Sequence, residues 1–126
     1  MVDYKVVAGI FNDFMALYVG KEKFRYGIEQ LYQKYPDNTL FQALMANMNE
    51  AHKLRVPEVL RNVYELFKPY RGRMLSDMEW EKIVNDTGKM NKMYGNNVWC
   101  RQILLELMNL LEQDDKELRN REKKAA

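Results

Sequence analysis

The sequence holds little of the chemistry that disulfides, metal sites and most catalytic centres require. It contains one cysteine, Cys100, and one histidine, His52. A single cysteine excludes an internal disulfide, so we expect a reducing, cytoplasmic setting. One cysteine and one histidine also exclude a zinc cluster of the usual cysteine–histidine kind.

Other catalytic signatures are missing as well. There is no glycine-rich phosphate loop, no Gly-x-Ser-x-Gly element and no Glu-x-x-His pair on a helix. The 20 basic and 18 acidic residues give a net charge of only +2, so the total charge predicts no polyanionic partner. We therefore expect a protein that is not an enzyme and that has no cofactor and no metal.

The chain also lacks long apolar runs. No uninterrupted stretch approaches the ~18 residues of a membrane span, and Met1–Lys5 lacks the layout of a signal peptide. With 47% apolar residues, the 126-residue chain can bury about two-thirds of its unfolded surface. These features predict one soluble, intracellular domain without a membrane contact.

Apolar residues recur near the helical period of 3.6 throughout, and nothing alternates as a strand would. The spacing predicts an all-α bundle of about six helices. These cover roughly 4–19, 21–35, a third beginning at 38 or 39, a fourth following Pro57, a fifth that begins at the Ser76–Glu79 capping box and is ended by Gly95, and a sixth beginning after Asn97. We place the folded domain at 1–113 and expect 114–126 to be a charged, solvated helical tail that frays.

Several residues mark where the helices begin and end. Asp3 is suited to cap the first helix, and Gly20 to end it in a left-handed conformation. Thr39–Gln42 and Ser76–Glu79 both match the capping box, in which two side chains satisfy free backbone amides. The tail excepted, each predicted helix therefore has a local start or stop signal.

Two turns resemble one another: Tyr35–Leu40 and Tyr94–Trp99. The apolar positions stay in step after each turn, with Leu44 matching Ile103. We interpret this as two related helix-turn-helix hairpins, covered by the first and fourth helices. Short turns predict antiparallel neighbours within each hairpin.

Cys100 and His52 each allow two interpretations. Cys100 falls in the first turn of its helix, where the dipole lowers a thiol pKa, or it is a small packed residue beside Trp99. His52 suits a helix end, where it interacts favourably with the dipole, or it serves as a general base in catalysis. A Cys–His pair requires the third and sixth helices to pack together.

Basic residues concentrate in one segment. Residues 53–73 carry six basic and two acidic groups, together with two tyrosines and an Arg-Gly-Arg sequence. Arginine beside exposed tyrosine suits phosphate contact and base stacking. The alternative function is therefore nucleic-acid binding through Arg55, Arg61, Lys68, Arg71 and Arg73.

A narrower version of that alternative places a DNA-reading helix after the second turn. Asn96, Asn97, Arg101 and Gln102 stand at the start of the sixth helix, and these residue types reach base edges. The asparagines are equally suited to cap the helix. The helix itself has the dense apolar pattern of a core element.

The leading function is a protein–protein interaction or regulatory module. Nine methionines, eight tyrosines and two tryptophans exceed what a small core needs, and methionine recurs at adaptable binding faces. Leu105 and Met108 widen the apolar arc of the sixth helix beyond a narrow stripe. The expected partner is another protein or a second copy of the chain.

On the fifth helix we expect the buried stripe Trp80, Ile83, Val84, Thr87 and Met90 or Met93.

Overall fold

A computed structural model describes residues 1–20 and 24–125, and every regular element within them is helical. The elements are α1 (Tyr4–Val19), α2 (Phe24–Lys34), α3 (Thr39–Met45), α4 (Met48–Ala51), α5 (Val56–Phe67), the 3-10 turn η2 (Lys68–Tyr70), α6 (Asp77–Met93) and α7 (Val98–Ala125). The predicted all-α fold is confirmed. The predicted residues 21–23 of the second helix lie outside the described part. None of the described helices is both long and apolar enough to cross a bilayer.

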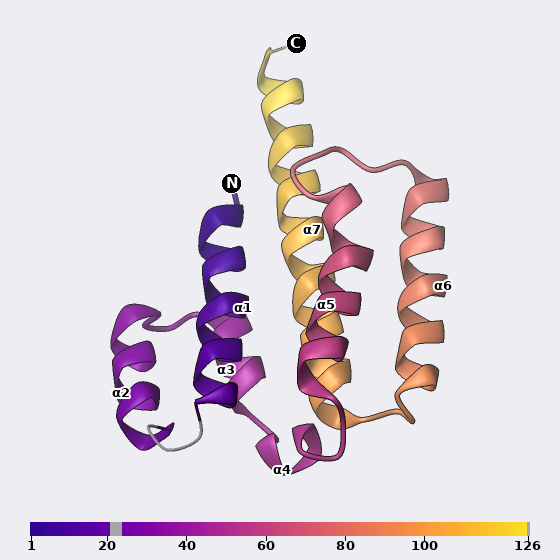
Figure 1. Cartoon of the computed structure of the whole chain (residues 1–126). Helices are drawn as coiled ribbons and strands as arrows, with labels where there is room; N and C mark the ends of the chain where they lie inside the picture. The colour runs from indigo at the N-terminus through magenta and orange to yellow at the C-terminus, as the bar shows by residue number, and fades with distance from the viewer. Residues whose placement is uncertain (21–23, 126) are drawn as a thin grey trace.

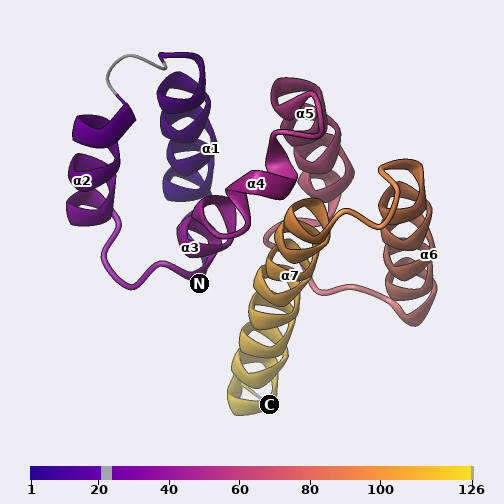
Figure 2. The same cartoon turned by 90° about the horizontal axis from the view of Figure 1, so that it is seen from below.

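The long helix α7 organises the molecule. It packs against α3, α4, α5 and α6, while α1 packs against α2, α3 and α5. Two views at right angles place α2 at one side of the bundle and α6 at the other (Figures 1 and 2). The two outer helices therefore have a neighbour on one side only.

The start of α1 agrees with its sequence, and its end does not. Asp3 accepts hydrogen bonds from the amides of Lys5 and Val6, as a cap should. Gly20 closes the helix with φ −84°, so the predicted left-handed end is wrong. Its amide still donates a hydrogen bond to the carbonyl of Ala16 at 3.0 Å. The last helical hydrogen bond therefore forms without a positive φ at Gly20.

The two similar turns share their backbone geometry. Asp37 and Asn96 occupy equivalent positions, and both are left-handed, with φ of 57° and 56°. The following Asn38 and Asn97 each accept a hydrogen bond from the amide three residues later, at 2.9 and 3.1 Å. The wider relation between two whole hairpins stays a prediction.

The third helix begins at Thr39, as predicted, but its capping residue differs from the prediction. Asn38, rather than Thr39, caps it, so the capping box predicted at Thr39–Gln42 is wrong. Asparagine takes this role because it stands one position earlier, with extended backbone dihedrals and its oxygen on the Phe41 amide. The helix stops at Met45, and a left-handed Asn47 separates it from the single turn α4.

The capping box at α6 is confirmed. The Ser76 hydroxyl accepts from the Glu79 amide at 3.1 Å, and the Glu79 carboxylate accepts from the Ser76 amide at 3.1 Å. Upstream, Pro57 lies in the first turn of α5, where its missing amide proton is not needed. Local signals therefore set both starts.

The predicted boundary after residue 113 has no counterpart in the structure. α7 continues to Ala125, and Asp114 and Asp115 are buried. Asp114 accepts from the amide of Val2 at 2.9 Å and from the Tyr4 hydroxyl, and Asp115 accepts from the amide of Leu75 at 2.8 Å. These two residues belong to the packed domain because their carboxylates accept hydrogen bonds from backbone amides of distant segments. Fraying of the last turns stays a prediction.

A single apolar core joins the helices. Its largest fully buried side chains are aromatic and come from four helices: Phe14, Phe41, Phe67 and Trp99. The indole of Trp99 donates to the Leu44 carbonyl at 2.9 Å. A helix leaves its last carbonyls without intrahelical partners, so this bond satisfies the end of α3 from inside the core.

Candidate functional site

Cys100 and His52 do not form a reactive pair. Helices α3 and α7 do pack together, but Cys100 is fully buried, and burial raises the pKa of its thiol to about 11. Of the two interpretations of Cys100, the small packed residue is confirmed, and the alternative of a pKa lowered by the helix dipole is not, because desolvation dominates. His52 is exposed at the end of α4, and its ring stacks on that of Tyr18. In residues 1–20 and 24–125 no group of three or more metal-ligating side chains comes together.

The two loop arginines of the basic segment are engaged within the fold. Arg71 donates to the Tyr64 hydroxyl at 2.8 Å and lies over the ring of Tyr4. Arg73 pairs with Glu79 at 2.7 Å and donates to a backbone carbonyl of the preceding turn. These contacts order the loop between η2 and α6.

The other three residues expected to bind nucleic acid are Arg55, Arg61 and Lys68, and they are exposed along α5 and η2. No observation joins all five into one surface directed at a ligand. Nucleic-acid binding by this segment therefore stays a prediction.

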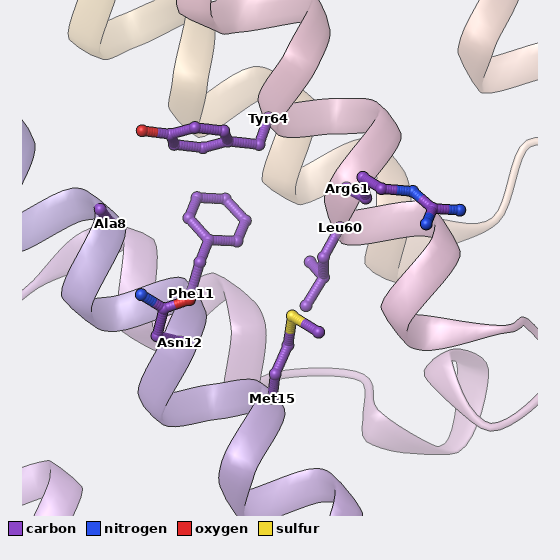
Figure 3. A pocket seen from close by; sticks show the side chains of 7 residues that line it. All are labelled: Ala8, Phe11, Asn12, Met15, Leu60, Arg61 and Tyr64. Atoms are coloured by element: carbon purple, nitrogen blue, oxygen red, sulfur yellow. The ribbon is translucent and has the colours of Figure 1, made fainter.

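A groove between α1 and α5 is the first hollow of note (Figure 3). Phe11 and Tyr64 meet edge to face within it, with ring centroids 5.6 Å apart, and Arg61 extends away from the groove. Its volume is about 220 Å³, below the roughly 300–1,000 Å³ of ligand pockets. We regard it as a packing gap between two helices.

The second hollow lies between α6 and α7. It also measures about 220 Å³, and almost all of its surface is apolar. Its lining comes from two antiparallel helices: Val84, Thr87, Gly88, Asn91, Arg101, Leu104, Leu105 and Met108. We call these eight residues the α6–α7 face.

Several apolar side chains of this face are in solvent. Val84 is 54% exposed and Leu105 42%, and Val98 at the start of α7 is 45% exposed. The expected burial of Val84 is wrong; of the alternatives Met90 and Met93, Met90 packs against the core and Met93 is 62% exposed. Ile83 and Thr87 are the residues of α6 that are buried. Because α6 has a neighbour on one side only, a stripe as wide as the predicted one cannot be covered.

Two polar atoms on this face have no hydrogen-bond partner within the described chain. Thr87 is 9% exposed, and its Oγ1 is buried without a partner, as is the Oδ1 of Asn91. An unsatisfied buried polar group costs free energy, so such groups normally find partners. Here both atoms lie beneath the surface of the groove, so its accessible surface stays almost wholly apolar.

Charge differs between the two ends of the face. Arg101 lines the groove at the end near the turn. At the opposite end, Glu81 lies one helical turn before Val84 and Glu112 one turn after Met108, and both are exposed. The groove therefore has a basic end and an acidic end.

The proposed DNA-reading residues are placed differently from one another. Asn97 is 8% exposed, and its amide group donates to the Glu50 carbonyl at 2.9 Å. Asn96 accepts from Asn91 at 3.0 Å. Both asparagines thus serve the turn, whereas Arg101 and Gln102 are exposed on α7.

Part of this site was absent from the sequence interpretation. Leu105 and Met108 had been recognised as a widened apolar arc, but Thr87 was expected only as part of a buried stripe. Gly88 and Asn91 were missed. The sequence signal for this groove is Gly88, a glycine inside a helix four residues after Val84. A residue without a side chain indicates open space on that side of the helix.

Compared with models of protein families, with curated proteins and with solved structures, the chain matches none, so the residues and geometry above carry the functional argument.

Proposed function

We propose that this chain is a small, non-catalytic protein-binding module and that the α6–α7 face contacts the partner. The observation that carries the proposal is the exposure of Val84 and Leu105 along one groove whose surface is almost wholly apolar. Apolar side chains left in water lose the free energy that burial provides. Covering them is therefore favourable.

The chemistry of the groove indicates what the partner presents. Apolar side chains fit against Leu104, Leu105 and Met108, which make up most of the α7 side. The polar oxygens of Thr87 and Asn91 lie beneath this surface, so the groove offers a partner an almost wholly apolar contact. We therefore expect a partner helix or strand with an apolar side.

Gly88 supports close approach of such a partner. A Cβ atom built at Gly88 meets nothing within 4 Å, so the groove is open at its centre. Small residues allow a second backbone to come near, which increases van der Waals contact. A large side chain at this position should block binding.

Site-specific photo-crosslinking tests the proposal. A photoreactive residue replaces Leu105 in the full chain, expressed in the cells from which the protein comes. The matched control carries the same residue in place of Met93, which is exposed on α6 but lines the α5–α6 side. The proposal expects a discrete adduct from position 105 that is lost with Val84→Asp. Equal labelling from both positions, or no adduct from position 105, would contradict it.

A further inference from the structure

We infer that the occupant of the α6–α7 face is the same face of a second copy of this chain, related by a two-fold axis; this inference rests on the proposed function. A two-fold interface uses one patch on both subunits, so the patch must be complementary to itself. The arrangement of charge along the groove meets this condition.

The helices α6 and α7 run antiparallel from the turn between them, so the groove has a defined direction (Figure 1). Asn91 lies beside Arg101 near the turn, and Val84 lies beside Met108 farther away. Glu81 and Glu112 follow at the far end.

A two-fold axis through the middle of the groove reverses its direction in the second copy. Such an axis lies across the groove and places α7 against α7 of the second copy, so Arg101 of each chain meets Glu112 of the other, with Glu81 beside it on α6. Arg101 and Glu112 are about 16 Å apart along α7, and this spacing sets the two charge contacts on either side of an apolar centre. A parallel placement would instead put like charges together.

The centre of such a pair is apolar and uncrowded. Leu105 lies near the middle of the α7 side, and Gly88, with open space at its Cβ position, lies on the α6 side. The Leu105 side chains of the two copies therefore meet near the axis, and the space at Gly88 leaves room beside them. Glu112 has an exposed partner within its own helix, Lys116 at 2.9 Å, and exposed pairs of this kind contribute little.

Sedimentation velocity on the full chain, over a wide range of concentrations, tests the inference first. Wild type should shift from monomer to dimer as concentration rises. Leu105→Asp should remain monomeric, or dimerise at least about tenfold more weakly, because a carboxylate would be buried at the centre. Met93→Asp, the matched control on the opposite side of α6, should dimerise as wild type does.

A charge-exchange experiment distinguishes this two-fold pairing from any other contact. Arg101→Glu alone, and the double variant Glu81→Arg/Glu112→Arg alone, should each dimerise poorly, because both contacts become repulsive. Mixed in equal amounts they should form a heterodimer, since both contacts are then between opposite charges. Raised salt should reduce these differences.

Two results would overturn the inference. Wild type that stays monomeric at every concentration excludes self-pairing, and a dimer unaffected by Leu105→Asp and by both charge variants uses another surface. The photo-crosslinking result separates these failures from failure of the proposed function. An adduct from position 105 to a different protein leaves the binding face intact with another occupant, whereas no adduct and no dimer would contradict both.

Discussion

The indole nitrogen of Trp99 lies 2.9 Å from the carbonyl oxygen of Leu44, within the buried core. This bond joins the first turn of α7 to the last turn of α3. A second bond of the same kind joins Asn97 to the carbonyl of Glu50 at the end of α4. The start of α7 thus satisfies a carbonyl at the end of α3 and gives a second donor to the Glu50 carbonyl, which also accepts from the Lys53 amide.

Trp99→Phe should lower the free energy of unfolding by about 1–3 kcal/mol, because it leaves the Leu44 carbonyl buried without its donor. Urea denaturation followed by circular dichroism measures the change. Trp80→Phe is the matched control, since Trp80 is only partly buried. An equal loss in both variants would contradict a special role for the Trp99 bond.

Asp115 and Arg119 form hydrogen bonds with both polar groups of the Leu75 backbone. Asp115 accepts from the Leu75 amide at 2.8 Å, and Arg119 donates to the Leu75 carbonyl at 2.6 Å and to Asp115. Burial alone would raise the pKa of Asp115, but the bonds from Arg119 and Leu75 outweigh it and hold that pKa below its ordinary value. The charged form is therefore the one that folding favours.

Asp115→Asn should cost about 1–3 kcal/mol near neutral pH, where the wild-type carboxylate is ionised. The stability that Asp115 provides is present above its unfolded pKa of about 3.9 and is lost as pH falls through its lower folded pKa. The difference in the free energy of unfolding between wild type and Asp115→Asn should thus become smaller in acid. Denaturation curves at a series of pH values check this, and a gap independent of pH would contradict the assignment.

Alanine substitution at two glycines should change the free energy of unfolding in opposite directions. Gly88 lies inside α6 with open space at its Cβ position, so Gly88→Ala should raise the free energy of unfolding by about 0.5–1 kcal/mol. Gly95 has φ +67°, so Gly95→Ala should lower it by about 1–2 kcal/mol. Thermal unfolding of both variants measures the difference. Destabilisation by Gly88→Ala would indicate that the groove is closed in solution.

Arg71→Ala distinguishes a structural role from nucleic-acid binding. Loss of the bond to Tyr64 should lower stability by about 0.5–1.5 kcal/mol, whether or not nucleic acid is present. If the basic segment binds DNA or RNA, Arg71→Ala and Arg73→Ala should also weaken binding across all sequences and flatten its salt dependence. Fluorescence anisotropy with short probes at low and physiological salt measures this. Unchanged anisotropy in both variants removes the segment as a binding surface.

Local signals predicted the helices well because they act within a few residues. The Asp3 cap, the Ser76–Glu79 box and the apolar period needed no knowledge of distant contacts. The break at Asn47 was missed, since a left-handed residue can interrupt an apolar pattern without changing it. Burial of Asp114 was missed because its partners, Val2 and Tyr4, lie at the other end of the chain.

The exposure of the α6–α7 face also depends on tertiary contacts that the sequence does not display. Ile83 and Val84 are neighbours with similar side chains, yet one is fully buried and the other 54% exposed. Successive residues in a helix point about 100° apart, so the position of α7 alone decides which of them is covered. The sequence contains both apolar residues but not the side on which the neighbour lies.

Hydrogen–deuterium exchange on the full chain, at low and high protein concentration, tests the central claim most directly. The account predicts slower exchange at high concentration in residues 84–91 and 101–108, with α1 unchanged, because pairing suppresses local opening of the weakly held α6. The Leu105→Asp variant should show no such slowing. Slowing confined to residues 53–73, or exchange that is the same at both concentrations, would contradict the assignment of the α6–α7 face as the surface where copies of the chain meet.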